Sequence, residues 1–217
     1  ATLRIDAQLA DRAEGLIAAV VEVDPTEPTV ETVVAPTTGG GNSETPHATI
    51  AGDALPAFDG TAGTDPAVGL PAPTVDGFDY DGNEIRIDPT EGPHLVMFQV
   101  HWCPHCAANL PDIQQWMADG TIPDWLQVTL VSTAETPDGD NYPAEQWLQE
   151  LGWTGRVLED APQGTSGAAG SAGVAYGATG WPYFVVIGVD GNVLARASGE
   201  LSVADMEELL AGLPDAP

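Results

Sequence analysis

The feature that most constrains the fold is a short apolar run that leads directly into the chain's only two cysteines. The run HLVMFQV, residues 94–100, is continuous and has the length of a strand buried on both faces. It passes into WCPHC at residues 102–106, and a helical pattern then extends to Gly120. A buried strand that turns at once into a helix predicts an α/β arrangement with both cysteines at the helix N-terminus.

The sequence after residue 69 alternates short strands and helices. Asp-Gly and Asp-Gly-Asn turns between apolar runs predict β-hairpins over 74–87 and 183–198. Further strands are expected at 126–133 and 156–160, and further helices at 142–152, 166–177 and 202–213, the last with Ser202 as its N-cap. This order predicts one α/β domain over residues 69–217, with a mixed central sheet and helices on both faces.

The first 68 residues have a different composition. Residues 1–23 carry apolar side chains near helical spacing and predict a weak helix. Residues 24–68 are rich in Pro, Thr, Gly and Ala and have almost no periodicity, so they are expected to form a disordered linker. Together these two segments predict a disordered N-terminal stem before the folded domain.

The charge of the chain disfavours nucleic acids and anionic lipid surfaces as partners. There are 33 acidic residues against five arginines and no lysine, which gives a formal net charge of -28. Such a surface repels phosphate backbones and anionic lipid headgroups, so nucleic acid is not an expected partner. The simplest interpretation of the acidity is solubility in a salty medium that screens the repulsion.

Membrane association is expected only through a segment upstream of this chain. No run of about 18 apolar residues is present, so none of the sequence is expected to cross a bilayer. The chain begins at Ala1, not Met, and we therefore expect that a signal or anchor was removed from its precursor.

Three interpretations of the cysteine pair can be compared. A structural disulfide between Cys103 and Cys106 would close a very short loop and contribute roughly 2 kcal/mol, little for a domain of this size. A metal site could draw on His101, Cys103, His105 and Cys106, but structural zinc sites combine two separated ligand pairs and no second pair is evident. The third interpretation is redox chemistry, which a C-x-x-C motif in a β-α-β context favours.

The redox interpretation has a direct physical basis. Helical residues three apart share a face, so the sulfurs of Cys103 and Cys106 can meet as thiols or as a disulfide. Free N–H groups and the helix dipole at the N-terminus favour a thiolate on Cys103. Pro104 suits the first helical turn because it lacks an N–H, and His105 between the sulfurs can add a cation or a hydrogen bond. Cys106, one turn further on, would be the resolving thiol.

These residues resemble the thioredoxin superfamily, which combines Trp-Cys-x-x-Cys, a helix and a later Gly-x-Pro before a hairpin. The Pro104-His105 pair is similar to that of DsbA-type oxidases, while the layout resembles TlpA-type extracytoplasmic oxidoreductases. The resemblance implies a thioredoxin-like fold in which Pro182 is a cis-proline facing the cysteines. It also implies that Trp181 pairs with an extended substrate chain and that Trp102 shields one side of the site.

The sequence departs from this family at two positions. The buried acid that often lies six residues before the first cysteine is replaced by Met97, and no carboxylate lies on that strand. Gln99 and His101 are the nearest polar side chains, and either can also be a strand residue with ordinary hydrogen bonds. The glutamate that some TlpA-type reductases place three residues after the second cysteine is Asn109 here.

The sequence thus predicts an extracytoplasmic thiol-disulfide oxidoreductase, membrane-anchored in its precursor, that acts without a cofactor. Its partners would be protein thiols or disulfides and a redox partner protein, with the direction of electron flow open. Two alternatives remain. One is a non-catalytic thioredoxin-like binding module, and the other is a peroxiredoxin-type peroxidase, which the lack of an arginine between Arg86 and Arg156 disfavours.

Overall fold

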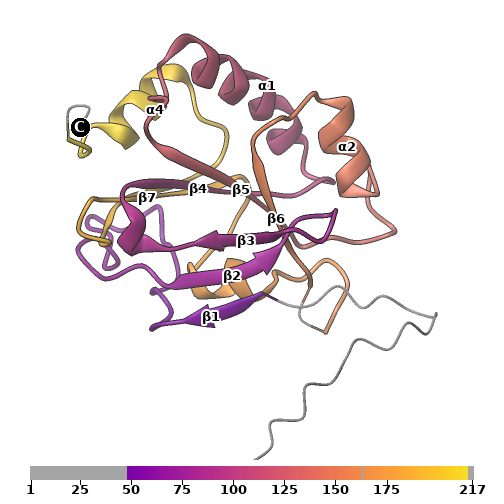
Figure 1. Ribbon diagram of the computed structural model, residues 1–217, viewed down its shortest axis with the longest axis horizontal. Helices are drawn as coiled ribbons and strands as arrows, with labels where there is room; N and C mark the ends of the chain where they lie inside the picture. Colours follow the sequence, from indigo (N-terminus) through magenta and orange to yellow (C-terminus); the bar gives the residue numbers. More distant parts are fainter. Residues whose placement is uncertain (1–47, 163, 215–217) are drawn as a thin grey trace, which may run out of the picture. The chain divides into compact units, whose positions relative to one another are not determined.

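The computed structural model describes residues 48–162 and 164–214 (Figure 1). The helix expected over 1–23 and residues 24–47 of the linker expected over 24–68 lie outside the described residues. None of the helices in the described ranges is both long and apolar enough to span a bilayer.

A mixed sheet forms the centre of the described domain. Its strands follow the order β1-β2-β6-β5-β4-β7-β8, with β3 paired to β2. Their bounds are β1 Thr49–Ala51, β2 Thr74–Phe78, β3 Glu84–Ile87, β4 His94–Gln99, β5 Gln127–Thr133, β6 Arg156–Asp160, β7 Tyr183–Ile187 and β8 Val193–Ser198. The two predicted hairpins are therefore β2–β3 and β7–β8, and both are confirmed.

The central strand β4 determines which segments meet at the end of the sheet. It runs parallel to β5, with Met97 opposite Leu130, and antiparallel to β7, with Phe98 opposite Tyr183. All six of its residues are buried, as the continuous apolar run predicts. Because β7 runs in the opposite direction, the chain that leaves β4 lies beside the chain that enters β7.

Helices cover both faces of the sheet, as the sequence predicts (Figure 1). The helices α1, α2 and α4 pack on the face that carries Leu95 and Met97, and α3 packs on the face that carries Val96 and Phe98. Their bounds are α1 Pro104–Asp119, α2 Ala144–Glu150, α3 Ser171–Ala175 and α4 Val203–Leu210, and a 3₁₀ turn lies at Pro89–Glu91. Ser202 caps α4 as expected, since its hydroxyl accepts from the Asp205 N–H.

The structure corrects the expected linker over its described part. Residues 49–51 form β1, in which Ile50 lies opposite Val75 of β2. The segment that follows, residues 52–68, which we call the strap, runs along the α3 face. The Leu55 N–H donates to the Ala175 carbonyl at 2.8 Å, and the Leu55 side chain is buried. The folded domain therefore includes residues 48–68, which composition alone assigned to the linker.

A buried arginine of β8 holds the strap in place. The Arg196 side chain is fully buried and donates through Nε to the Asp65 carboxylate at 2.7 Å and through Nη2 to its other oxygen. Its Nη1 donates to the Pro56 carbonyl at 2.8 Å, and the guanidinium lies 5.3 Å from the Phe58 ring centroid. The hydrogen bond from Arg196 lowers the pKa of the Asp65 carboxyl. Pairing with Asp65 and a carbonyl makes burial of this cation tolerable.

We predict that Arg196→Ala lowers the free energy of unfolding by about 3–5 kcal/mol, because it leaves the Asp65 carboxylate partly buried without its partner. Urea unfolding followed by tryptophan fluorescence measures the change. Arg86→Ala is the matched control, since Arg86 pairs with Asp76 and Asp88 on the exposed surface and such pairs contribute little. Equal effects of the two substitutions would contradict the role assigned to Arg196.

A second prediction concerns salt. With a net charge of -28, carboxylate repulsion opposes the compact state, and raising ionic strength from about 0.1 to 1 M shortens the screening length from about 10 to 3 Å. We expect the free energy of unfolding to rise over this range, equally in NaCl and KCl. A decrease with salt would mean that attractive ion pairs outweigh the repulsion.

Candidate functional site

The first cysteine lies at the N-terminus of α1, as the sequence predicts. After β4 the chain turns, and the Cys103 N–H donates to the Val100 carbonyl at 3.1 Å. Cys103 is the N-cap residue, and its Sγ accepts from the Cys106 N–H at 3.4 Å. Pro104 occupies the first helical position, where its missing N–H costs no hydrogen bond. The helix N-terminus therefore offers a hydrogen bond and its dipole to a thiolate on Cys103.

The two thiols differ in exposure. Both cysteines are free, and Cys103 keeps 6% of its surface accessible whereas Cys106 keeps none. Burial raises the pKa of the Cys106 thiol far above its ordinary value, and the hydrogen bond with Cys103 adds to the effect. The geometry thus separates an outer sulfur that a reagent can reach from an inner sulfur held as a thiol.

The predicted cis-proline, Pro182, follows a residue that contacts Cys103. The Trp181–Pro182 peptide bond is cis, and the Trp181 carbonyl accepts from the Cys103 thiol at 3.6 Å. Trp181 is brought here from 78 positions away because β7 pairs antiparallel with β4. The structure therefore brings together Cys103, Trp181 and Pro182, which the resemblance placed in one site.

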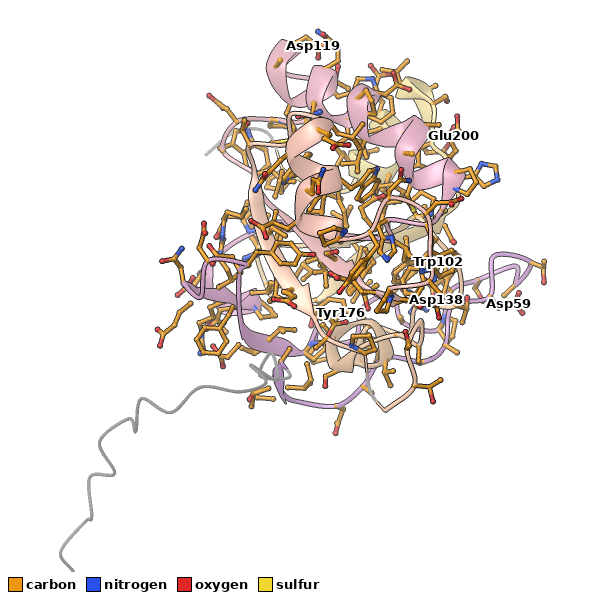
Figure 2. The ribbon with its side chains drawn as sticks, turned by 90° about the vertical axis from the view of Figure 1, so that its right-hand side faces the viewer. Asp59, Trp102, Asp119, Asp138, Tyr176 and Glu200 are labelled. Atoms are coloured by element: carbon orange, nitrogen blue, oxygen red, sulfur yellow. The ribbon has the colours of Figure 1, made fainter. Side chains whose placement is uncertain are left out.

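Trp102 precedes Cys103 and packs against the loop that follows β5. Its indole Nε1–H donates to the Ala134 carbonyl at 2.8 Å, and Figure 2 shows it close to Asp138 of that loop. A Cβ on Gly139 would lie 2.9 Å from the Trp102 Cβ, so only glycine fits there. The half-buried ring is thus fixed in position beside Cys103.

His101 is a structural residue. Its ring is buried, with Nδ1 2.5 Å from the Asp140 carbonyl and Nε2 accepting from the Thr136 N–H at 3.2 Å. These partners assign the ring proton to Nδ1 and leave no nitrogen free to take a proton from a cysteine. Of the two roles left open by the sequence, His101 has the ordinary one. Gln99 is also buried, and its amide has no hydrogen-bond partner among the described residues.

His105 and Asn109 both contact the loop before α4. His105 is exposed, and its Nδ1 lies 3.2 Å from Glu200 Oε2. Asn109 is fully buried and makes two hydrogen bonds to the backbone of Leu201. Sequence reasoning missed Glu200, because it follows His105 by 95 positions and belongs to no motif.

Two of the side chains considered as metal ligands are directed to different parts of the domain. The rings of His101 and His105 contact different loops. Within residues 48–162 and 164–214, no three His, Cys, Asp or Glu side chains are grouped as metal ligands.

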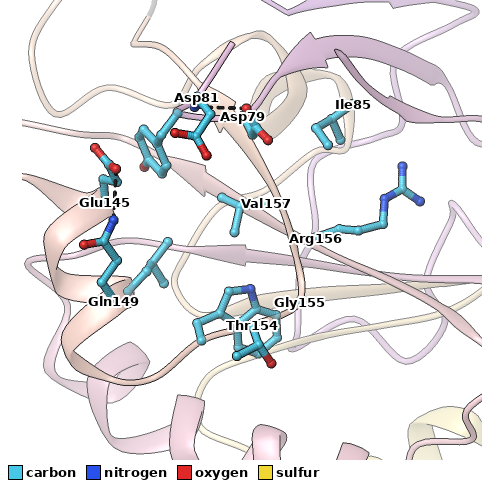
Figure 3. A pocket seen from close by; sticks show the side chains of 12 residues that line it. Asp79, Asp81, Ile85, Glu145, Gln149, Thr154, Gly155, Arg156 and Val157 are labelled. Atoms are coloured by element: carbon cyan, nitrogen blue, oxygen red, sulfur yellow. Dashed lines mark hydrogen bonds between the residues drawn. The ribbon is translucent and has the colours of Figure 1, made fainter. Parts of the chain in front are cut away.

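A separate cavity of about 400 Å³ lies between the β2–β3 hairpin and α2. Figure 3 shows Asp79 and Asp81 on one side of it, Glu145 and Gln149 of α2 on another, and Val157 between them. None of the predicted site residues lines this cavity. It is therefore distinct from the cysteine site.

Several solved structures resemble this domain. A putative thiol:disulfide interchange protein DsbE from Chlorobium tepidum is 26% identical, with a TM-score of 0.52 over 66% of this chain and 93% of that one. A thioredoxin family thiol:disulfide interchange protein from the same organism is 22% identical, with a TM-score of 0.50 over 65% and 93% of the two chains. This chain has a thioredoxin-like fold. A DsbF homologue from Corynebacterium diphtheriae is 15% identical, with a TM-score of 0.55 over 73% and 99%.

No protein-family model and no curated protein sequence matches the chain. The resemblance to the thioredoxin superfamily is confirmed at the level of the fold, and the roles of individual residues in this thioredoxin-like site remain proposals.

The unequal burial of the two thiols gives a prediction. In the reduced protein at neutral pH, iodoacetamide should modify Cys103 and leave Cys106 unmodified until the protein unfolds, because burial keeps Cys106 protonated and inaccessible. Peptide mass spectrometry of native and urea-unfolded samples measures this, with Cys103→Ser as the control for labelling at Cys106. Equal labelling of both cysteines in the native protein would contradict it.

Proposed function

We propose that this protein is an extracytoplasmic thiol-disulfide oxidoreductase that exchanges the Cys103–Cys106 dithiol or disulfide with protein substrates. The observation that carries the proposal is the position of Cys103 Sγ. It caps α1, accepts from the Cys106 N–H and contacts the carbonyl of Trp181, which precedes the cis-proline. Cys103 Sγ thus has a backbone N–H that donates to it, a second thiol close enough to resolve a mixed disulfide, and a backbone segment beside it that could bind a substrate chain.

In the reducing direction the exchange takes two steps. The Cys103 thiolate attacks one sulfur of a substrate disulfide, forms a mixed disulfide and releases the other substrate sulfur as a thiolate. Cys106 then gives its proton to the released substrate thiolate and attacks Cys103 Sγ, which releases the second substrate thiolate and leaves the Cys103–Cys106 disulfide. Two electrons pass from the protein to the substrate, and the reverse sequence oxidises a substrate dithiol.

Burial of Cys106 supports the assignment of the two roles. A nucleophile that must meet a protein substrate has to be the outer sulfur, and only Cys103 retains accessible surface. Because Cys106 is one helical turn away, it can attack Cys103 Sγ without a large movement of the chain. Its raised pKa keeps it from competing for the incoming disulfide.

The segment before β7 is proposed to bind the substrate chain. Pro182 follows Trp181, whose carbonyl already points at Cys103. A substrate strand could pair with the Trp181 backbone and bring its own sulfur to Cys103, as β-strand addition does elsewhere. Trp102, which is held against the loop after β5, would border the site as an apolar wall.

The finer assignments are also proposals. A TlpA-type arrangement, with an anchor upstream of this chain and a redox partner protein in the envelope, fits the layout of the sequence. The direction of electron flow follows from the reduction potential, which is about −270 mV for thioredoxin and about −120 mV for DsbA. A potential near the thioredoxin value would indicate a reductant, and one near the DsbA value would indicate an oxidant.

We predict that Cys103→Ser abolishes reduction of insulin disulfides by the dithiothreitol-driven protein. Cys106→Ser should instead accumulate a mixed disulfide on Cys103, because nothing resolves it. Non-reducing gels with mass spectrometry detect the adduct. The double Cys103→Ser, Cys106→Ser variant is the control and should form none.

Two outcomes would overturn the proposal. If Cys103→Ser leaves the biological role intact and the wild type exchanges no disulfides, the chain is a binding module. If the wild type instead consumes hydroperoxide at a rate far above its disulfide exchange, it is a peroxidase.

A further inference from the structure

A carboxylate from a distant loop contacts the histidine between the two cysteines. Glu200 lies in the loop between β8 and α4, and its Oε2 is 3.2 Å from Nδ1 of His105. Figure 2 shows Glu200 beside α1, well away from Asp119 at the helix C-terminus. The first turn of α1 has no acidic residue of its own. The carboxylate at this turn is therefore supplied by tertiary structure.

The fold holds the backbone of this loop in place. The Asn109 Nδ2 donates to the Leu201 carbonyl at 3.0 Å, and the Leu201 N–H donates to Asn109 Oδ1 at 3.1 Å. Asn109 is fully buried and Leu201 packs in the same core as Cys106. Ser202, the next residue, caps α4. These contacts fix the residues that follow Glu200 against α1 and bring its side chain within reach of His105.

We propose that Glu200 is a positioning residue for His105 in the redox reaction, an inference that rests on the function proposed above. The His105 Nδ1–H donates to the Glu200 carboxylate, which holds the ring in one orientation and tautomer. His105 is two residues after Cys103 in the first turn of α1, and a ring held in one orientation presents a fixed dipole to the Cys103 sulfur.

The arrangement follows the general logic of preorganised electrostatics, in which a polar group near the reacting sulfur is held in place by a second group. The effect should be modest, because the side chains of His105 and Glu200 keep 69% and 48% of their surface exposed. Pairs of this kind change an equilibrium by a factor of about two to three.

The test compares Glu200→Ala with Glu200→Gln in the reduced, full chain. Glu200→Ala should lower both the alkylation rate of Cys103 at neutral pH and the equilibrium constant for reduction of the protein by glutathione about two- to threefold. A threefold change corresponds to roughly 14 mV. Glu200→Gln should retain most of the wild-type values, because its amide oxygen still accepts from Nδ1–H. If Gln behaves like Ala, the carboxylate acts by charge and the positioning role is wrong.

A double-mutant cycle tests whether Glu200 acts through His105. In a His105→Ala background, Glu200→Ala should change neither quantity. A persistent effect there would show that Glu200 acts directly on Cys103 and would overturn the proposal, as would the absence of any effect in the wild-type background. Glu207→Ala is the matched control, because it removes the same charge from the exposed face of α4 and should leave both quantities unchanged.

The two proposals fail in different ways. If the wild-type protein exchanges no disulfides with glutathione, the proposed function is wrong. If it does exchange them and Glu200→Ala is indistinguishable from wild type, only the role of Glu200 is wrong.

Discussion

Burial of β4 on both faces is the constraint on which the site depends. A strand with no exposed residue must lie between other strands, and here it lies between β5 and β7. The antiparallel pairing of Phe98 with Tyr183 then requires that the segment after β4 and the segment before β7 emerge side by side. Cys103 and Trp181 meet for that reason. The contact between them is a consequence of sheet register and needs no dedicated interaction of its own.

The polar residues near the cysteines serve mainly to fix the surrounding loops. His101 uses both ring nitrogens on the loop of residues 136–140, and Asn109 uses its amide on Leu201. Each of these residues was prominent in the sequence because the proteins that it resembles often have a functional acid at or near these positions. In this chain the Leu201 groups that Asn109 satisfies are buried, and leaving such groups without partners would cost more than their hydrogen bonds contribute.

The contacts that hold the strap on the α3 face of the sheet also support the segment that carries Trp181 and Pro182. Arg196 joins the strap to the sheet, and its Nη1 also donates to the Tyr183 hydroxyl at 3.1 Å. That hydroxyl donates in turn to the Tyr176 carbonyl at 2.9 Å. Tyr183 directly follows Pro182, so the network stiffens the strand entry that presents Trp181. Rigid support of this kind is what a positioned binding segment requires.

Local patterns in the sequence determined the buried central strand, both hairpins, the order of helices and strands, and the location of Cys103 at a helix N-terminus. Each of these depends on residues that are close in the chain, through periodicity, turn chemistry or capping. The order of residues 48–68 could not be predicted, because a Pro- and Thr-rich segment without periodicity is held by partners far away in the chain. These are β2, the backbone of α3 and, for Asp65, an arginine more than 130 positions away. The partners of His101 and His105 could not be predicted either, because they too are far away in the sequence. Only the tertiary structure decides which distant backbone carbonyl or carboxylate comes within hydrogen-bonding distance, since sheet order and loop path set those distances.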